Sequence, residues 1–132
     1  MKEEMNGNDI RKFQIHRILM NEPLTADILI LSAGVEVNLY GGCLPHIGAV
    51  SIVDPERNLT TTQFPTHKDG VVSAKWARTI ADAGYLPVTV IAGIHYDNLT
   101  KEEIAVVVEA TDEMLKEALE QLYAHISSKK SE

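Results

Sequence analysis

Apolar and polar side chains alternate along the first half of the chain, which predicts a series of β-strands. In residues 11–20 and 35–40 the apolar positions fall two apart, as in a strand with one buried face. Residues 26–32, ADILILS, form a continuous apolar run of strand length. Two more β-rich segments follow at 47–53 and 59–64. The predicted turns between these strands are Asn21-Glu22-Pro23, Ala33-Gly34 and residues 54–58.

The second half of the chain has the periodicity of two helices separated by one strand. Val72, Trp76 and Ile80 are spaced to share one helix face, and Gly84 follows as the expected C′ residue. Residues 87–94, PVTVIAGI, are the best strand candidate in the chain. Thr100 and Glu103 have the spacing of a capping box. A broad apolar stripe then runs along a long helix, at residues 104, 107, 108, 111, 114, 115, 118, 119, 122 and 126.

Strands first and helices later predict an α+β fold, with a mostly antiparallel sheet covered by two helices, the C-terminal one long. Residues 1–10 are expected to be a disordered lead-in and residues 127–132 a polar tail, so that 11–126 form a single domain. The stripe on the long helix is wide enough for part of it to pack against a second copy. A homodimer is therefore expected.

Composition excludes several classes of partner. The net charge of −7 opposes nucleic acid, which needs clustered Lys and Arg to displace its counterions. No apolar run approaches the ~20 residues of a membrane-spanning helix. The first residues, MKEEMNGNDIRKF, contain no apolar core of a signal peptide, so a cytoplasmic location without membrane attachment is expected.

Three segments carry candidate chemistry, and the first is YGGCLPHIGAVSIV, residues 40–53. Gly41 and Gly42 can expose successive amides to an anion, and Gly48 allows a ligand to approach the backbone closely. Pro45 favours an extended geometry that would present His46 to a phosphate or a ring oxygen. The glycine spacing matches neither a dinucleotide fingerprint nor a P-loop. The alternative interpretation is a plain connection between strands.

The second segment is PTHKDGVVSAKWAR, residues 65–78, around a helix start. Thr66 and Asp69 are both candidates for the N-cap, at the positive end of the helix dipole. Its basic residues reverse the sign of an otherwise acidic protein and suit a phosphate, although the Asp69 carboxylate competes for the same amides. The alternative is a capped helix with a solvated basic face. The candidate ligand residues here are His67, Lys68 and Lys75.

The third segment, GIHYDN at residues 93–98, directly follows the strongest strand. Tyr96 is suited to stack on a planar ring and His95 to hydrogen-bond to it. The alternative is a β–α connection in which Asp97 and Asn98 only turn the chain.

No pattern in the sequence predicts catalysis or a metal. His46, His67 and His95 are separated by 21 and 28 residues, which is no local ligand signature, so no metal site is expected. Neither a nucleophile with its base nor paired carboxylates stand out. Cys43, the single cysteine, is interpreted as a small buried group. The inventory favours a protein that holds a planar phosphorylated molecule, with a small histidine-based enzyme as the weaker alternative.

Three longer stretches, GGCLPHIGAVSIV, THKDGVVSAKWARTIA and PVTVIAGIHYDNLTKEEI, together resemble one known family over residues 11–125. This is the prenylated flavin chaperone family, the small D subunits of gallate-decarboxylase-type UbiD systems. The resemblance implies a proteasome-assembly-chaperone-like fold, a dimer, and a non-catalytic protein that binds prenylated FMN or FMN.

The implied partners are a UbiD-type decarboxylase, which receives the cofactor, and a flavin prenyltransferase. The amphipathic long helix and the acidic surface leave open an alternative, an accessory interaction subunit that stabilises a decarboxylase without touching cofactor. The cofactor-binding residues implied by the matching stretches are Gly41, Gly42, Pro45, His46, Gly48, His67, Lys68, Lys75, His95 and Tyr96.

Overall fold

The computed structural model describes residues 10–65 and 68–130, with side chains up to Ser127. Three sequence predictions fall on residues outside the described ranges: most of the expected lead-in at 1–10 (residues 1–9), the N-cap candidate Thr66 and the ligand candidate His67. The described elements are β1 (Arg11–Leu19), β2 (Glu22–Leu31), β3 (Gly34–Gly42), β4 (Ala49–Val53), β5 (Leu59–Gln63), α1 (Gly70–Asp82), β6 (Val88–His95) and α2 (Lys101–Lys130).

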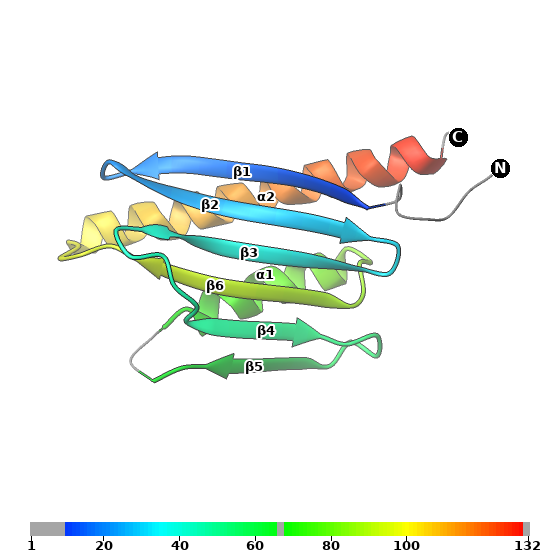
Figure 1. Cartoon of the computed structure of the whole chain (residues 1–132), viewed down its shortest axis with the longest axis horizontal. Coiled ribbons are helices and arrows are strands. Elements are labelled where there is room, and N and C mark those ends of the chain that lie inside the picture. The colour runs from blue at the N-terminus through cyan, green and yellow to red at the C-terminus, as the bar shows by residue number, and fades with distance from the viewer. Residues whose placement is uncertain (1–9, 66–67, 131–132) are drawn as a thin grey trace.

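The strands form one six-stranded sheet in the order β1-β2-β3-β6-β4-β5. Helix α1 carries the chain back along the sheet, so that β6 enters between β3 and β4 and runs parallel to β3. Every other pair of neighbouring strands is antiparallel. Figure 1 shows both helices on the same face of this sheet. The predicted fold class, with a long C-terminal helix, is confirmed.

The core lies between the sheet and the two helices. Alternate residues of each central strand face it, as Ala26 and Ile28 of β2 do beside Leu39 and Val37 of β3. The apolar run of β2 therefore divides between the two faces of the sheet. From the helices, the fully buried side chains include Trp76 of α1 and Met114, Ala118 and Leu122 of α2.

The predicted turn at Asn21-Glu22-Pro23 is wrong by one or two residues. Met20 and Asn21 make the turn, with φ of 48° and 65°, and Pro23 already lies in β2 opposite Ile18. Positive φ at both central residues characterises the type I′ hairpin, which matches the twist of its strands. Proline is tolerated near the start of a strand, so Pro23 does not end the ladder.

The predicted helix boundaries are largely confirmed. Gly84, with φ of 104°, follows the C-cap of α1. The capping box of α2 is formed, because the Thr100 amide donates to the Glu103 carboxylate (2.9 Å) and the Glu103 amide to the Thr100 hydroxyl (3.1 Å). Helix α2 continues into the expected polar tail as far as Lys130. No helix in the described ranges is both long and apolar enough to span a membrane.

Candidate functional site

A cleft of about 430 Å³ lies where the first turn of α1, the carboxyl end of β6 and the first turns of α2 meet. This volume is in the range of small-molecule sites. The cleft receives residues from all three segments singled out in the sequence. Its lining residues are His46, Lys68, Asp69, Val71, Val72, Ile94, His95, Tyr96, Leu99, Ile104, Val107, Val108 and Thr111.

One wall of the cleft is aliphatic and open to solvent. Val71 of α1 is 76% exposed, and Ile104 and Val108 of α2 are 50% and 49% exposed. The apolar stripe of α2 packs against the core in its later turns, where Met114 and Leu122 are fully buried. Its first turns instead present their aliphatic side chains to the cleft. Exposed apolar side chains gathered in one place mark a surface that binds something.

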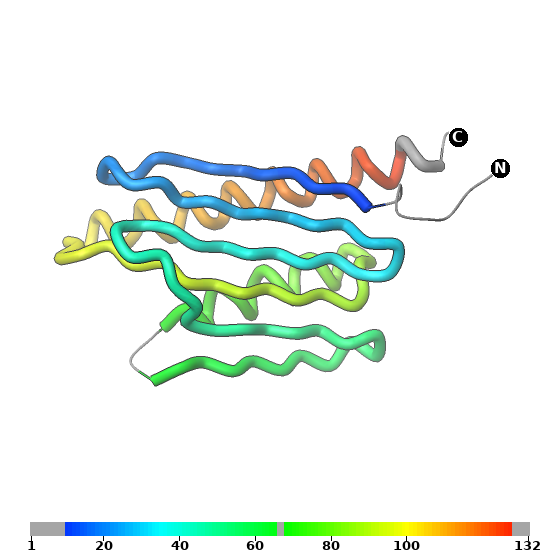
Figure 2. Tube along the Cα trace, viewed as in Figure 1, coloured from blue at the N-terminus to red at the C-terminus, as the bar shows by residue number. Residues whose placement is uncertain are grey.

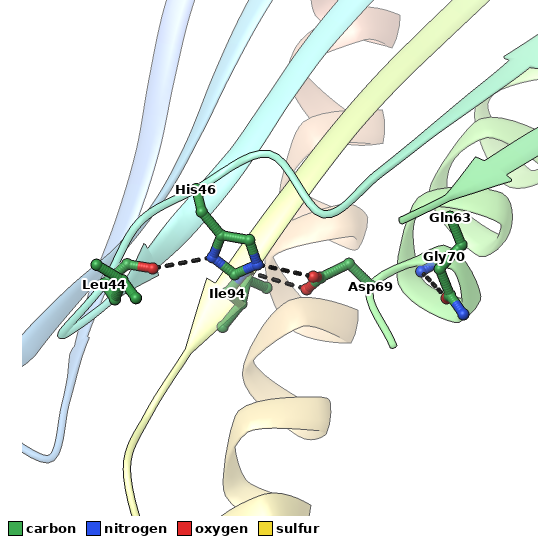
Figure 3. Close-up of polar contacts among 6 residues, drawn as sticks. All are labelled: Leu44, His46, Gln63, Asp69, Gly70 and Ile94. Carbon is green, nitrogen blue, oxygen red and sulfur yellow. Dashed lines mark hydrogen bonds and ion pairs between the residues drawn. The ribbon is translucent and has the colours of Figure 1, made fainter. Parts of the chain in front are cut away.

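The buried carboxylate of Asp69 joins the three segments (Figure 3). Its Oδ1 accepts a hydrogen bond from the amide of Ile94 in β6 (3.0 Å), and its Oδ2 lies 3.1 Å from Nε2 of His46. Nδ1 of His46 is in turn 2.9 Å from the carbonyl oxygen of Leu44. Both ring nitrogens of His46 are thus engaged within the protein, and the ring braces the loop rather than presenting a donor.

This arrangement changes the interpretation of the α1 start. Asp69 is the N-cap residue by position, yet its side chain makes no capping hydrogen bond and turns to β6 instead. The amide of Gly70 donates to Oε1 of Gln63 (2.8 Å). Among the described residues, which do not include 66 and 67, the amides of Val71 and Val72 have no acceptor, and both lie at the positive end of the helix dipole.

Two glycines let the loop between β3 and β4 cross over β6, as Figure 2 shows. A Cβ on Gly93 would lie 1.5 Å from the carbonyl oxygen of His46, and one on Gly48 would lie 2.0 Å from Oδ2 of Asp69. The Gly48 amide donates to the carbonyl of Ala92 (2.9 Å). Gly48 therefore supports the site by allowing close packing of protein against protein.

Gly41 and Gly42 lie inside the sheet and are not among the residues that line the cleft. A Cβ on Gly41 would lie 2.5 Å from the carbonyl oxygen of Pro23, and one on Gly42 would lie 1.9 Å from that of His95. Both residues are buried and pair with β6 in the strand ladder. Pro45 lines a separate hollow of about 330 Å³, together with Tyr40 and Ile91.

The predicted basic face of α1 is only partly at the cleft. Lys68 lines it and is exposed. Lys75 forms an ion pair with Asp112 of α2 (2.7 Å), and Arg78 donates to the carbonyl of Arg57 (3.1 Å). These two side chains tie α1 to its neighbours, so Lys68 is the described lysine placed to meet a ligand in the cleft.

His95 and Tyr96 both line the cleft. The Tyr96 hydroxyl donates to the carbonyl of Glu22 (3.2 Å), and burial raises the pKa of this phenol, with the Glu22 carboxylate adding to the effect. The interpretation of Cys43 as a buried group is wrong, because it is exposed beside Asp97. Desolvation and a hydrogen bond to Asp97 raise the pKa of its thiol.

The residues that sequence reasoning missed are the aliphatic ones. Val71 stands outside the predicted apolar face of α1, and the stripe of α2 was assigned as a whole to packing. One signal in the sequence could have indicated them. The first turns of both helices contain more apolar residues than a single buried helix face requires. The missed lining residues are Val71, Val72, Ile94, Leu99, Ile104, Val107 and Val108.

Comparison with known proteins places this chain in a defined family. The family model described as "Prenylated flavin chaperone LpdD-like domain" matches residues 20–123. The chain therefore belongs to the LpdD-like chaperone family. Protein LpdD of Lactiplantibacillus plantarum (strain ATCC BAA-793 / NCIMB 8826 / WCFS1) is 29% identical over 107 residues, which cover 77% of this chain and 79% of that protein.

A solved structure shares the fold at low sequence identity. It is described as the crystal structure of a novel chaperone complex for yeast 20S proteasome assembly. The match has a TM-score of 0.54 at 13% identity and covers 88% of this chain and 97% of that one. The expected likeness to proteasome-assembly chaperones is confirmed at the level of the fold.

Proposed function

We propose that this chaperone-family protein binds a flavin nucleotide, prenylated FMN or FMN, in the cleft and carries it without chemical change. The observation that supports this best is the composition of the cleft. One wall is aliphatic and suits a flat ring system, while Lys68 and the first amides of α1 lie at its edge and suit a phosphate. The family description names a prenylated flavin chaperone, which agrees with this ligand class.

The proposed contacts differ in kind between the two parts of the ligand. The isoalloxazine ring lies against Val71, Ile104 and Val108, with Tyr96 held in place by its hydroxyl hydrogen bond. The phosphate is met by Lys68 and by the first backbone amides of α1. His46 contributes through the loop it braces rather than through a direct hydrogen bond.

Titration with FMN and with prenylated FMN, followed by flavin fluorescence and absorbance, tests the proposal. Val108→Glu is expected to weaken binding of both flavins at least about tenfold, because it places a charge on the apolar wall. Lys68→Ala should weaken FMN more than riboflavin, which lacks the phosphate. Lys116→Ala, an exposed lysine of α2 that does not line the cleft, is the matched control. Absence of flavin binding by the wild-type chain would refute the proposal.

The proposed client is a UbiD-type decarboxylase that takes the flavin from this protein, with a flavin prenyltransferase as the donor. Exposed aliphatic side chains around the cleft support contact with another protein, because a carrier must bring its ligand to the client's surface. A pull-down of the decarboxylase with flavin-free and flavin-loaded protein tests this. Preference of the apo decarboxylase for the loaded form supports transfer. Equal binding of both forms favours the alternative, an accessory subunit that acts without cofactor.

We further propose that the chain works as a homodimer in which a second copy covers the open side of the cleft. Ile104, Val106 and Val108 are all at least 44% exposed on the first turns of α2, where the apolar stripe is unpacked. Light scattering coupled to size exclusion is expected to give twice the chain mass. Ile104→Glu should shift the protein toward monomer, whereas a monomeric wild type would contradict the dimer without touching the flavin proposal.

A further inference from the structure

An exposed cluster of three potential metal ligands lies beside the cleft. Cys43 follows β3, His95 ends β6 and Asp97 stands two residues beyond it. Among the described residues, these side chains are the one group of three whose Cys, His or carboxylate ligand atoms all lie within 4.8 Å of one another. The sequence gives no hint of it, because Cys43 and His95 are 52 residues apart.

The backbone builds this juxtaposition. Strands β3 and β6 run parallel with Gly42 opposite His95, and the amide of Cys43 donates to the carbonyl of His95 (2.8 Å). Gly42, with φ of 85°, allows this approach, because a Cβ there would lie 1.9 Å from that same carbonyl oxygen. The thiol and the imidazole therefore start from neighbouring backbone positions that the sheet holds in place.

The order of contacts within the cluster suits chelation better than nucleophilic chemistry. The carboxylate of Asp97 lies in the middle, with Oδ1 2.8 Å from Nε2 of His95 and Oδ2 3.3 Å from Sγ of Cys43. A nucleophilic cysteine needs the histidine in the middle, so that the imidazole takes the thiol proton. Here the Cys43 thiol contacts the Asp97 carboxylate rather than an imidazole nitrogen, and the three ligand atoms lie within 4.8 Å of one another.

We infer that Cys43, His95 and Asp97 form a binding site for a zinc ion. Zinc takes sulfur at about 2.3 Å and nitrogen and oxygen at about 2.0–2.2 Å, so tetrahedral ligand atoms stand about 3.3–3.6 Å apart. The present separations of 2.8 and 3.3 Å reach those values by small rotations of exposed side chains. A mixed sulfur, nitrogen and oxygen set favours zinc over magnesium or calcium.

Three protein ligands leave the fourth position of the ion to solvent or to an exchangeable ligand. His95 both belongs to the cluster and lines the cleft, so the ion would stand at the edge of the proposed flavin site. The inference does not depend on flavin binding, because it rests on the three side chains and is tested with the metal alone.

Titration with cobalt(II), a spectroscopic substitute for zinc, tests the site in the full chain. The protein is first freed of metal with a chelator, and its thiol is kept reduced with a phosphine. One equivalent is expected to give a near-ultraviolet thiolate-to-cobalt charge-transfer band and visible bands of four-coordinate cobalt, both removed by zinc. Cys43→Ser should abolish the charge-transfer band. His95→Ala and Asp97→Asn should each lower the affinity at least about tenfold, the scale on which residues that support metal sites act. His16→Ala, an exposed histidine of β1, is the matched control.

Circular dichroism of each variant shows whether it is folded, and the exposure of all three side chains predicts that it is. Absence of the charge-transfer band in the wild type would overturn the inference. So would a band that survives unchanged in both His95→Ala and Asp97→Asn, since the thiol would then bind cobalt alone. Loss of cobalt affinity in Asp97→Asn together with normal flavin binding supports the metal site and leaves the proposed flavin site intact, because Asp97 does not line the cleft.

Discussion

The Asp69 carboxylate offers the sharpest test of how the site is held together. It is 8% exposed and bonds two other segments, the amide of Ile94 at 3.0 Å and the ring of His46 at 3.1 Å. Asp69→Ala removes both bonds and leaves the Ile94 amide without its acceptor. A hydrogen bond to a charged group contributes about 1.5–3 kcal/mol, and an orphaned buried donor costs about 1–3 kcal/mol.

Because these contributions overlap, we expect Asp69→Ala to lower the free energy of unfolding by about 3–4 kcal/mol. For a chain of this size, that corresponds to a fall of roughly 10–15 °C in the thermal midpoint. Asp69→Asn keeps an acceptor for the Ile94 amide and loses the charge, so about 1–2 kcal/mol is expected. His46→Ala removes only one of the two bonds and should also cost about 1–2 kcal/mol.

Urea denaturation measures these values, with Trp76 as an internal reporter because it is the single tryptophan and is fully buried. Asp82→Ala is the matched control, since Asp82 is exposed on α1 and should change stability by less than about 0.5 kcal/mol. The double variant of Asp69 and His46 should show a coupling of about 0.5–3 kcal/mol. If Asp69→Ala unfolds like the control, Asp69 does not join the three segments.

Three further changes probe the loop crossing, a turn and the core. Gly93→Ala should lower the free energy of unfolding in urea by at least about 2 kcal/mol, because the new Cβ would lie 1.5 Å from the His46 carbonyl oxygen. An unchanged stability would mean that the loop does not cross β6 there. The pKa of Asp54 is held below its usual value, first by a hydrogen bond from the backbone amide of Asn58. The stability that the ionised carboxylate contributes is therefore fully present above the pKa of the unfolded state, and it is lost as the pH falls through the pKa of the folded state. The thermal midpoints of wild type and Asp54→Ala should therefore converge between about pH 5 and pH 2, and a constant difference would contradict this. The indole N–H of Trp76 is buried with no partner among the described residues. Trp76→Phe should therefore lower the free energy of unfolding by clearly less than the roughly 3–5 kcal/mol expected for Trp76→Ala, as measured by circular dichroism. Equal losses of stability in the two variants would contradict this.

The features of the fold that sequence reasoning predicted are those set by local physics. Alternation two residues apart marked the strands, and the pairing of Thr100 with Glu103 marked the start of α2. The turn between β1 and β2 was misplaced because proline is a strong turn signal, while here the positive φ of Met20 and Asn21 decides. The insertion of β6 between β3 and β4 depends on pairing between strands distant in sequence, which no local pattern encodes.

The candidate site was predicted by segment rather than by residue. His46, Lys68, His95 and Tyr96 do line one cleft, because their segments meet where β6 ends and α1 begins. Lys75 was assigned to a ligand from its charge alone, and only the packed structure shows that Asp112 is its partner. The same limitation applies to the candidate glycines. The atoms that leave no room for a side chain at these positions belong to other strands and to Asp69, which are distant in sequence.

The polar groups of the cleft bear on how the proposed carrier function would allow release of the ligand. The nitrogens of His46, Nε2 of His95 and the hydroxyl of Tyr96 already have partners within the protein. In the proposed complex, most of the affinity must therefore come from the aliphatic wall, with Lys68 as the charged contact. Apolar contact contributes about 25 cal/mol per Å² and one charge-assisted hydrogen bond about 1.5–3 kcal/mol, and the cost of ordering the ligand offsets part of this, so we expect binding no tighter than about micromolar. A nucleotide held in this way would bind more weakly here than in an enzyme that surrounds it with dedicated hydrogen bonds. Under the proposed function, this difference in affinity would favour transfer from the chaperone to the enzyme.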